Sequence, residues 1–281
     1  MVGVVTQPDR PAHRGQRLTP PPVKQRALET GLPVLQPPRL RDAGWPERLR
    51  EFGADVAVVI AFGQILPRAV LDVPTRGSIN VHASLLPRYR GAAPIAWAIM
   101  RGETETGITT IQMDEGMDTG AMLLRVATPI GPDETAGDLS RRLAALGADV
   151  LIDTLAQLDT LTPIPQLHED ATLAPRLKKT DGDLDWQRPA RDLVNVVRGC
   201  HPWPGALTAN AAGKLSVWRA AAVTAGRRES PGTLVDHGGE LAISTGDGGF
   251  LPLEVQPENK RRMSWPDYLR GTRLTAGARF S

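Results

Sequence analysis

The chain has 281 residues, of which 41% are hydrophobic and 23% are charged, and its net charge is +2. These values are typical of globular proteins and exclude a chain that is disordered throughout. Since a domain commonly holds about 150 residues, the length predicts two domains. The longest apolar run, Val56 to Phe62, is far shorter than the roughly 18 residues that a membrane span needs. No signal-peptide pattern opens the chain, so we expect a cytoplasmic protein.

A single cysteine and an uneven charge distribution are further features of the composition. Cys200 can form no disulfide within the chain, and we interpret it as a structural thiol rather than a nucleophile. Residues 1–50 hold nine Lys and Arg against four Asp and Glu, and residues 260–281 hold six against one. Such segments can bind a polyanion, although solvated surface charge is the commoner explanation.

The first part of the chain alternates predicted strands and helices. Residues 2–5 form the end of a strand and lead into a basic loop, residues 6–15, whose prolines and glycine disfavour regular structure. Helices are predicted over residues 22–30, 45–52, 92–100 and 134–158, and strands over residues 33–35, 54–62, 78–82, 107–113 and 121–130. The strand over 54–62 is almost entirely apolar, which is typical of a strand buried on both faces of a parallel sheet. This alternation predicts a doubly wound, mostly parallel α/β domain over residues 1–160.

The remainder of the chain has a different pattern. Residues 161–182 are rich in Pro, Thr, Lys and Asp, and we interpret them as a linker on the surface. One helix is predicted over residues 190–198, and short strands are predicted over residues 206–209, 214–222, 232–236, 241–245 and 251–255. The Gly-rich turns between these strands predict a C-terminal β-barrel domain, of the OB type, over residues 183–281.

The start of the chain differs from an ordinary doubly wound sheet. Such a sheet places another strand and helix before a basic loop of this kind. We therefore expect a unit of roughly 20 to 30 residues to be missing before Met1.

Asn80 and His82 are the first candidates for a catalytic site. They lie two residues apart on a predicted strand, so their side chains share one face at the carboxyl end, where open α/β sheets place their sites. An Asn amide can donate to a developing oxyanion, and an imidazole can donate to the same oxygen or take a proton from an attacking amine. A structural hydrogen-bonding role is the alternative, because Asn-x-His alone is a weak pattern.

Two further segments extend this candidate site. The loop over residues 83–94 carries Leu85 and Leu86, which either pack in the core or contact a flat, largely apolar cofactor. The turn over residues 114–120 carries Asp118 between two glycines. An Asp directed at His82 would orient the ring and raise its basicity, whereas a cap of the turn is the simpler role.

These segments resemble the signature of formyltransferases that use 10-formyltetrahydrofolate. The matching residues are Ser78-Ile-Asn-Val-His-Ala-Ser-Leu-Leu-Pro-Arg-Tyr-Arg-Gly91 and Asp118-Thr-Gly120. Four more segments narrow the resemblance to the methionyl-tRNA formyltransferases: Thr6-Gln-Pro-Asp-Arg-Pro-Ala-His-Arg-Gly15, Gly91-Ala-Ala-Pro-Ile95, Gln112-Met-Asp-Glu-Gly-Met-Asp-Thr-Gly120 and Asp183-Leu-Asp-Trp186. The resemblance extends over the whole chain, with looser matches at His201-Pro-Trp-Pro204 and Lys260-Arg-Arg-Met263. Family members begin with a strand and a Gly-rich turn that have no counterpart here.

The resemblance implies transfer of a formyl group from 10-formyltetrahydrofolate to the α-amine of methionine on initiator tRNA, without a metal. It assigns catalysis to Asn80, His82 and Asp118. It assigns folate binding to Ser84, Leu85, Leu86, Pro87, Phe62, Ile65, Leu66, Asp114 and Gly116, of which the last five belong to the pterin pocket. It assigns tRNA binding to Arg10, Arg14 and Arg17, with Arg14 as the best candidate for a specific contact. In the C-terminal domain we expect Lys214, Arg219, Lys260 and Arg261 to contact the tRNA backbone.

Three other functions stay open. A formyltetrahydrofolate hydrolase and a sugar-nucleotide N-formyltransferase share the Asn, His and Asp trio, but the tRNA-facing loop and the C-terminal β domain argue against both. A tRNA-binding protein with an inactive catalytic domain would bind tRNA in a salt-sensitive way without folate turnover. We expect a monomer whose partners are methionyl initiator tRNA and 10-formyltetrahydrofolate, and no membrane.

Overall fold

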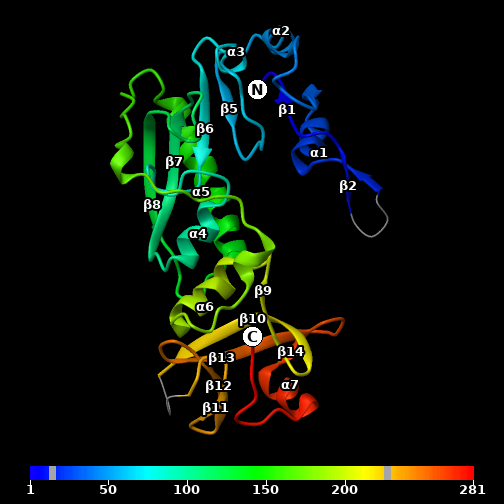
Figure 1. The fold of residues 1–281 in the computed structure, drawn as a ribbon. Helices are drawn as coiled ribbons and strands as arrows, with labels where there is room; N and C mark the ends of the chain where they lie inside the picture. Colours follow the sequence, from blue (N-terminus) through cyan, green and yellow to red (C-terminus); the bar gives the residue numbers. More distant parts are fainter. Residues whose placement is uncertain (13–16, 225–228) are drawn as a thin grey trace. The chain divides into compact units, whose positions relative to one another are not determined.

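The computed structural model describes residues 1–12, 17–224 and 229–281 (Figure 1). The helices are α1 (Pro22–Glu29), α2 (Trp45–Arg50), α3 (Arg68–Leu71), α4 (Pro94–Met100), α5 (Ala136–Ala156), α6 (Ala190–Gly199) and α7 (Trp265–Thr272), with one-turn 3₁₀ helices at His168–Asp170 and Lys179–Gly182. The strands before α5 are β1 (Val4–Val5), β2 (Arg10–Ala12), β3 (Arg17–Thr19), β4 (Val34–Leu35), β5 (Ala57–Val59), β6 (Ser78–His82), β7 (Glu105–Gln112) and β8 (Met122–Pro129). The strands after α6 are β9 (Ala206–Asn210), β10 (Gly213–Val223), β11 (Leu234–His237), β12 (Glu240–Ser244), β13 (Gly249–Pro257) and β14 (Met263–Ser264).

The chain forms two compact units, each built from segments that are separated in the sequence. The first comprises residues 1–82, 108–126 and 147–171, and the second comprises residues 83–107, 127–146 and 172–281. Strands β7 and β8 and helix α5 contribute residues to both units. Within the described ranges, no helix combines the length and the apolar character that a membrane crossing requires.

The first unit contains a mixed four-stranded sheet in the order β5-β6-β7-β8. Strand β6 runs parallel to β5 and antiparallel to β7, with Asn80 opposite Val59 on one side and Ile111 on the other. Strands β1 and β4 form a separate parallel pair, and β2 and β3 form an antiparallel pair in the basic loop. Strands and helices thus alternate as expected, while the sheet is parallel in one part and antiparallel in another.

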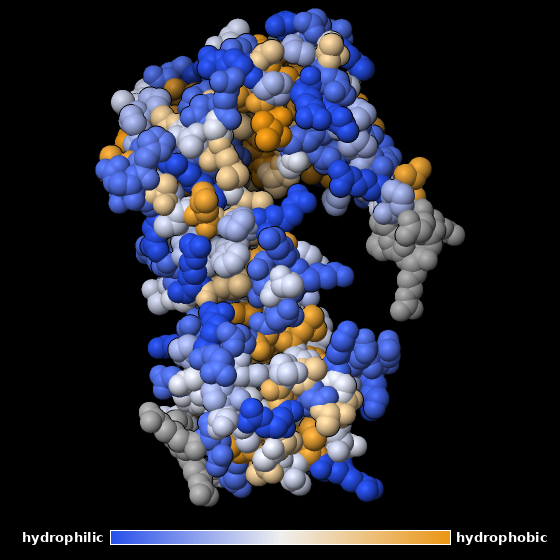
Figure 2. Space-filling view, in the orientation of Figure 1, coloured by the Kyte–Doolittle hydropathy of each residue, from blue (hydrophilic) through white to orange (hydrophobic). Residues whose placement is uncertain are grey.

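Strand β5 departs from the expected burial on both faces. Among the described residues it pairs on one side only, with β6. The side chain of Val58 is 38% exposed and that of Ile60, just beyond the strand, is 56% exposed. Figure 2 shows apolar, orange side chains at the surface of this part of the molecule. An apolar run gives a strand, but its neighbours determine how far the strand is buried, and here β5 has a single neighbour.

The second unit is built around an antiparallel sheet in the order β11-β12-β13-β10-β9, with β14 also paired to β13. Strand β10 is the longest and pairs with both β9 and β13. Its register with β13 shifts near Arg219. The pairing follows an open path from β11 to β9, so the described strands form an antiparallel sheet and no closed barrel.

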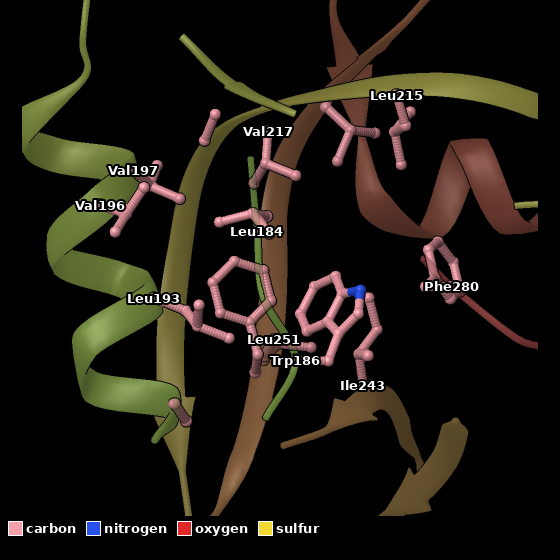
Figure 3. Close-up of a cluster of buried hydrophobic side chains, with 14 of the residues drawn as sticks. Leu184, Trp186, Leu193, Val196, Val197, Leu215, Val217, Ile243, Leu251 and Phe280 are labelled. Carbon is pink, nitrogen blue, oxygen red and sulfur yellow. The ribbon is translucent and has the colours of Figure 1, made fainter. Parts of the chain in front are cut away.

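Helix α6 covers the core of this sheet, as Figure 3 shows. Its residues Leu193, Val196 and Val197 are buried against side chains of the strands, and Trp186 meets the ring of Phe250 edge-on at 5.3 Å between centroids. Buried Ala96 and Met100 of α4 belong to the same core cluster. The two helices approach closely because Gly199 has no side chain: a Cβ there would lie 2.4 Å from the Met100 side chain.

Residues 161–182, the expected surface linker, are only partly exposed. Gln166, Ala174 and Leu177 are buried, and Ile164 forms two backbone hydrogen bonds of 2.8 Å with Met122 of β8. The composition of this segment predicts that it lacks regular structure. Composition alone does not reveal that such a segment can pair with the edge of a strand.

Candidate active site

Strand β6 positions the first two candidate residues. Its backbone pairs on both sides, with β5 and β7, so the alternation of its side chains is fixed. Asn80 and His82 therefore project from one face. The His82 side chain is 6% exposed, while Asn80 is half-buried.

Asp118 lies in the turn that joins β7 to β8, and its backbone is left-handed, with a φ of 55°. Asp is among the few residues other than Gly that adopt this conformation readily. Asp114 organises the start of the turn, because its Oδ1 accepts from Gly116 N at 3.0 Å and from Thr119 Oγ1 at 2.6 Å. At the end of the turn, a Cβ on Gly120 would lie 1.9 Å from the Gln112 carbonyl oxygen, so this close approach requires Gly.

The fold brings the three predicted catalytic residues together. Asn80 Nδ2 donates to Asp118 Oδ1 at 3.2 Å. His82 Nδ1 lies 3.6 Å from the same oxygen, which is within ion-pair distance but longer than a hydrogen bond. The Asp118 side chain is 16% exposed. One carboxylate oxygen therefore faces both an amide and an imidazole at the carboxyl end of β6, an arrangement suited to holding an oxyanion and moving a proton.

A cavity of about 200 Å³ lies beside Asp118 in the first unit. Four predicted folate-binding residues line it together with Asp118: Ile65, Leu66, Asp114 and Gly116. Phe62 does not line it; this residue packs against the buried cluster that includes Leu66, and its carbonyl oxygen accepts from Gln7 Nε2 at 2.7 Å.

The residues over 84–87 belong to the second unit. Ser84 Oγ donates to the Arg88 carbonyl oxygen at 2.6 Å and closes the start of the loop. Leu86 is fully buried, so its role is core packing, whereas Leu85 and Pro87 are half-buried and present part of their surface.

Tyr89 anchors the same loop. Its hydroxyl donates to Glu103 Oε1 at 2.6 Å, and burial together with this bond raises the pKa of Tyr89 to about 12. The loop that follows β6 is therefore held by specific bonds within the second unit.

The basic residues that are predicted to bind tRNA lie in both units. Arg10 is exposed and donates to Gln7 Oε1 at 2.9 Å. Arg17 begins β3, whereas Arg14 lies outside the described residues. In the second unit Lys214, Lys260 and Arg261 line a groove of about 580 Å³ that Asp267 and Glu258 also line, and Arg219 is exposed on β10. Among the described residues, no three His, Cys, Asp or Glu side chains gather as they would around a metal ion.

Two groups of residues near the site were not predicted from the sequence. Ile111, Met113 and Met117 also line the cavity beside Asp118, and their positions around the predicted turn were the only available signal. Gln166 contacts the backbone of the Asp118 turn, yet it lies in the expected linker, where no pattern in the sequence points to it.

Comparisons with known proteins show which family this chain resembles. The model of the family described as "Formyl transferase" matches residues 1–155, and that described as "Formyl transferase, C-terminal domain" matches residues 176–273. The methionyl-tRNA formyltransferase of Symbiobacterium thermophilum is 49% identical over 287 residues, covering 100% of this chain and 88% of the relative. That of Solibacter usitatus is 48% identical over 277 residues, covering 98% of this chain and 89% of the relative.

Solved structures of lower identity share the fold. The N-formyltransferase from Helicobacter canadensis has a TM-score of 0.64 at 15% identity, covering 90% of this chain and 99% of that one. HypX from Aquifex aeolicus, solved in complex with tetrahydrofolic acid, has a TM-score of 0.60 at 17% identity, covering 95% of this chain and 46% of that one. The two family models and the full-length relatives together show that this chain belongs to the formyl transferase family.

Proposed function

We propose that this protein transfers a formyl group from 10-formyltetrahydrofolate to the α-amine of methionine on initiator tRNA, and so acts in translation initiation. Full-length relatives named methionyl-tRNA formyltransferase support the substrates. The observation that carries the chemistry is the convergence of Asn80 and His82 on one oxygen of Asp118. All three residues lie in one unit of a single chain, so the reaction needs no second copy, and we expect a monomer.

Asn80 supplies the oxyanion donor in this mechanism. The α-amine attacks the formyl carbon, a nitrogen–carbon bond forms, and the carbonyl oxygen gains negative charge. An amide nitrogen carries two hydrogens, and Asn80 Nδ2 gives one to Asp118. The other donates to the oxyanion, where a fixed donor is worth more than water because it needs no reorganisation.

His82 transfers the proton, and Asp118 positions the His82 ring. With Nδ1 on the side of the Asp118 carboxylate, the ring presents Nε2 to the reacting centre. The amine loses one proton during the attack, and the folate nitrogen gains one when its bond to the formyl carbon breaks. His82 moves this proton between the two nitrogens, so that atoms and charge balance without a metal.

The cavity beside Asp118 is the proposed pterin pocket. Ile65 and Leu66 provide apolar surface for a flat ring, while the carboxylate of Asp114 and the backbone at Gly116 provide polar groups. The resemblance also assigns folate binding to the following loop, in which Leu85 and Pro87 present part of their surface. These groups fit a molecule that is apolar on its faces and polar at its edges.

We assign catalysis to residues 1–160 and tRNA binding to the basic loop and to residues 183–281, joined by residues 161–182. Exposed Arg10 and the groove that Lys260 and Arg261 line carry positive charge of the kind that phosphates attract. Arg14 and Arg17 complete the assignment in the basic loop. The reaction belongs to the cytoplasm, because translation supplies its tRNA substrate there.

Replacing the oxyanion donor tests the proposal. We expect the Asn80→Ala variant to lower the turnover of methionyl initiator tRNA about 100- to 1000-fold, the usual effect of losing one such donor. Formyl transfer from 10-formyltetrahydrofolate is measured with the whole chain, and circular dichroism checks that the variant folds. Gln157→Ala serves as the control, because Gln157 is exposed and donates only to the Asp153 carbonyl in α5; its turnover should equal that of the unchanged protein.

Other outcomes select other functions. Unchanged turnover in Asn80→Ala would contradict the role of Asn80. Release of formate without transfer would identify a hydrolase. Salt-sensitive tRNA binding by the unchanged protein, without any folate turnover, would identify a tRNA-binding protein whose catalytic domain is inactive.

A further inference from the structure

Gln166 is buried beside the candidate active site, although it lies 48 residues after Asp118 in the sequence. Its side chain is 6% exposed. Its Nε2 donates to the Asp118 carbonyl oxygen at 2.9 Å and to the Gly120 carbonyl oxygen at 2.7 Å. An amide nitrogen has two hydrogens, so both are used on the turn that carries the Asp118 carboxylate.

The position of Gln166 is itself fixed from both sides. Two residues before it, Ile164 exchanges backbone hydrogen bonds of 2.8 Å with Met122, the first residue of β8. Two residues after it, the one-turn helix His168–Asp170 begins. One antiparallel β-bridge to β8 therefore places the segment beside the turn that Gln166 contacts.

The turn needs such a support because its geometry is demanding. Asp118 has a left-handed backbone, and Gly120 packs directly against the Gln112 carbonyl. The two bonds from Gln166 hold the backbone on both sides of Thr119. The Asp118 carboxylate is joined to this backbone through Cβ alone, so a shift of the turn shifts the carboxylate with it.

We propose that Gln166 is a positioning residue for formyl transfer, acting through Asp118. It holds the turn so that Asp118 Oδ1 stays near Asn80 Nδ2 and His82 Nδ1. A displacement of about 1 Å in a catalytic group can cost about 100-fold in rate, so this support affects turnover directly. The inference rests on the proposed function.

Gln166→Met tests the inference, because Met has the same length and no amide. We expect turnover at saturating substrates to fall about 10- to 100-fold, with the KM for methionyl initiator tRNA within about threefold of its original value. Gln157→Met is the matched control: it also removes an amide that donates to a backbone carbonyl, but at the end of α5, and its turnover should not change.

A double-mutant cycle separates positioning from general stabilisation. Asp118→Asn is the second substitution, because Asn also accepts a left-handed backbone. If Gln166 acts through the carboxylate, Gln166→Met changes the single-turnover rate less than threefold in the Asp118→Asn background. An equal fold-change in both backgrounds, or turnover of Gln166→Met equal to that of the unchanged protein, would overturn the inference.

The activity of the unchanged protein distinguishes failure of this inference from failure of the proposed function. If the unchanged protein transfers no formyl group, the proposed function fails and the role of Gln166 fails with it. If the unchanged protein is active and Gln166→Met is equally active, only the positioning role fails. Should Gln166→Met not fold, as judged by circular dichroism, Gln166→Glu keeps the length and polarity of the side chain and takes its place in the same cycle.

Discussion

Cys200 occupies a position where a thiol is protected from solvent. It follows helix α6, is fully buried, and donates to the Asp181 carbonyl oxygen at 3.5 Å and to Met100 Sδ at 3.9 Å. Burial, followed by the nearby Asp181 carboxylate, raises the pKa of the Cys200 thiol to about 12. Since the thiolate is the reactive form, this cysteine is inert in the folded protein.

Alkylation measures this protection. At pH 8 we expect the native protein to react with a thiol reagent about 100- to 1000-fold more slowly than the protein unfolded in guanidinium, because far less thiolate is present and access is blocked. Mass spectrometry of the labelled protein gives both rates. Equal rates would show that the side chain reaches solvent in the native state.

The residues of the site differ in how far the sequence could predict them. The two-residue period of a strand predicts that Asn80 and His82 share a face, and the turn between two glycines makes Asp118 a candidate. Gln166 could not be found in this way, because it meets the turn through a pairing of Ile164 with Met122 that no local pattern encodes. Leu86 shows the opposite case: the resemblance assigns it to folate binding, yet it is fully buried.

At the scale of elements, the start of α5 depends on an ion pair. Glu134 Oε1 accepts from Arg142 Nε and Glu134 Oε2 accepts from Arg142 Nη2, both at 2.9 Å, and Oε2 also accepts from Gly131 N at 3.0 Å. The Glu134 side chain is 14% exposed. These bonds, above all those from Arg142, lower the pKa of the Glu134 carboxyl below its usual 4.5.

Glu134→Gln tests this pair through its pH dependence. A carboxyl whose pKa is lowered by folding stabilises the protein above its unfolded pKa and loses this contribution as the pH falls through its folded pKa. We expect the variant to lower the free energy of unfolding by about 1 to 2 kcal/mol at pH 7, with the difference shrinking as the pH falls below 4.5. Urea unfolding at several pH values measures it.

An exposed ion pair provides the control for that prediction. Arg26 and Glu29 on α1 have side chains that are 77% and 63% exposed, so Glu29→Gln should change stability by less than about 0.5 kcal/mol at every pH. A constant difference for Glu134→Gln from pH 7 down to the acid limit would contradict the role of its charge.

At the scale of the whole molecule, the sequence predicted the elements better than it predicted their partners. Most strands and helices follow from the periods of their side chains, and the change of pattern after residue 160 predicts a domain boundary there. The compact units divide the chain differently, because α4 packs with α6, about 100 residues later. Periodicity shows which face of a helix is apolar, but it does not show which helix covers it.

A shortened chain tests this shared core. A fragment of residues 1–171 lacks α6, so Ala96 and Met100 of α4 lose the core in which they are buried. We expect the fragment to unfold without a sharp thermal transition and to lack near-ultraviolet circular dichroism, unlike the whole chain. A cooperative transition in the fragment would show that α4 finds its packing within the first part of the sequence.

The open side of β5 has a consequence for handling the protein. Its backbone groups on that side have no strand partner among the described residues, and apolar Val58 and Ile60 lie beside them at the surface. An edge of this kind is a template on which another chain can add a strand. We therefore expect the monomer to self-associate through this edge when the protein is concentrated, so purification belongs at low protein concentration.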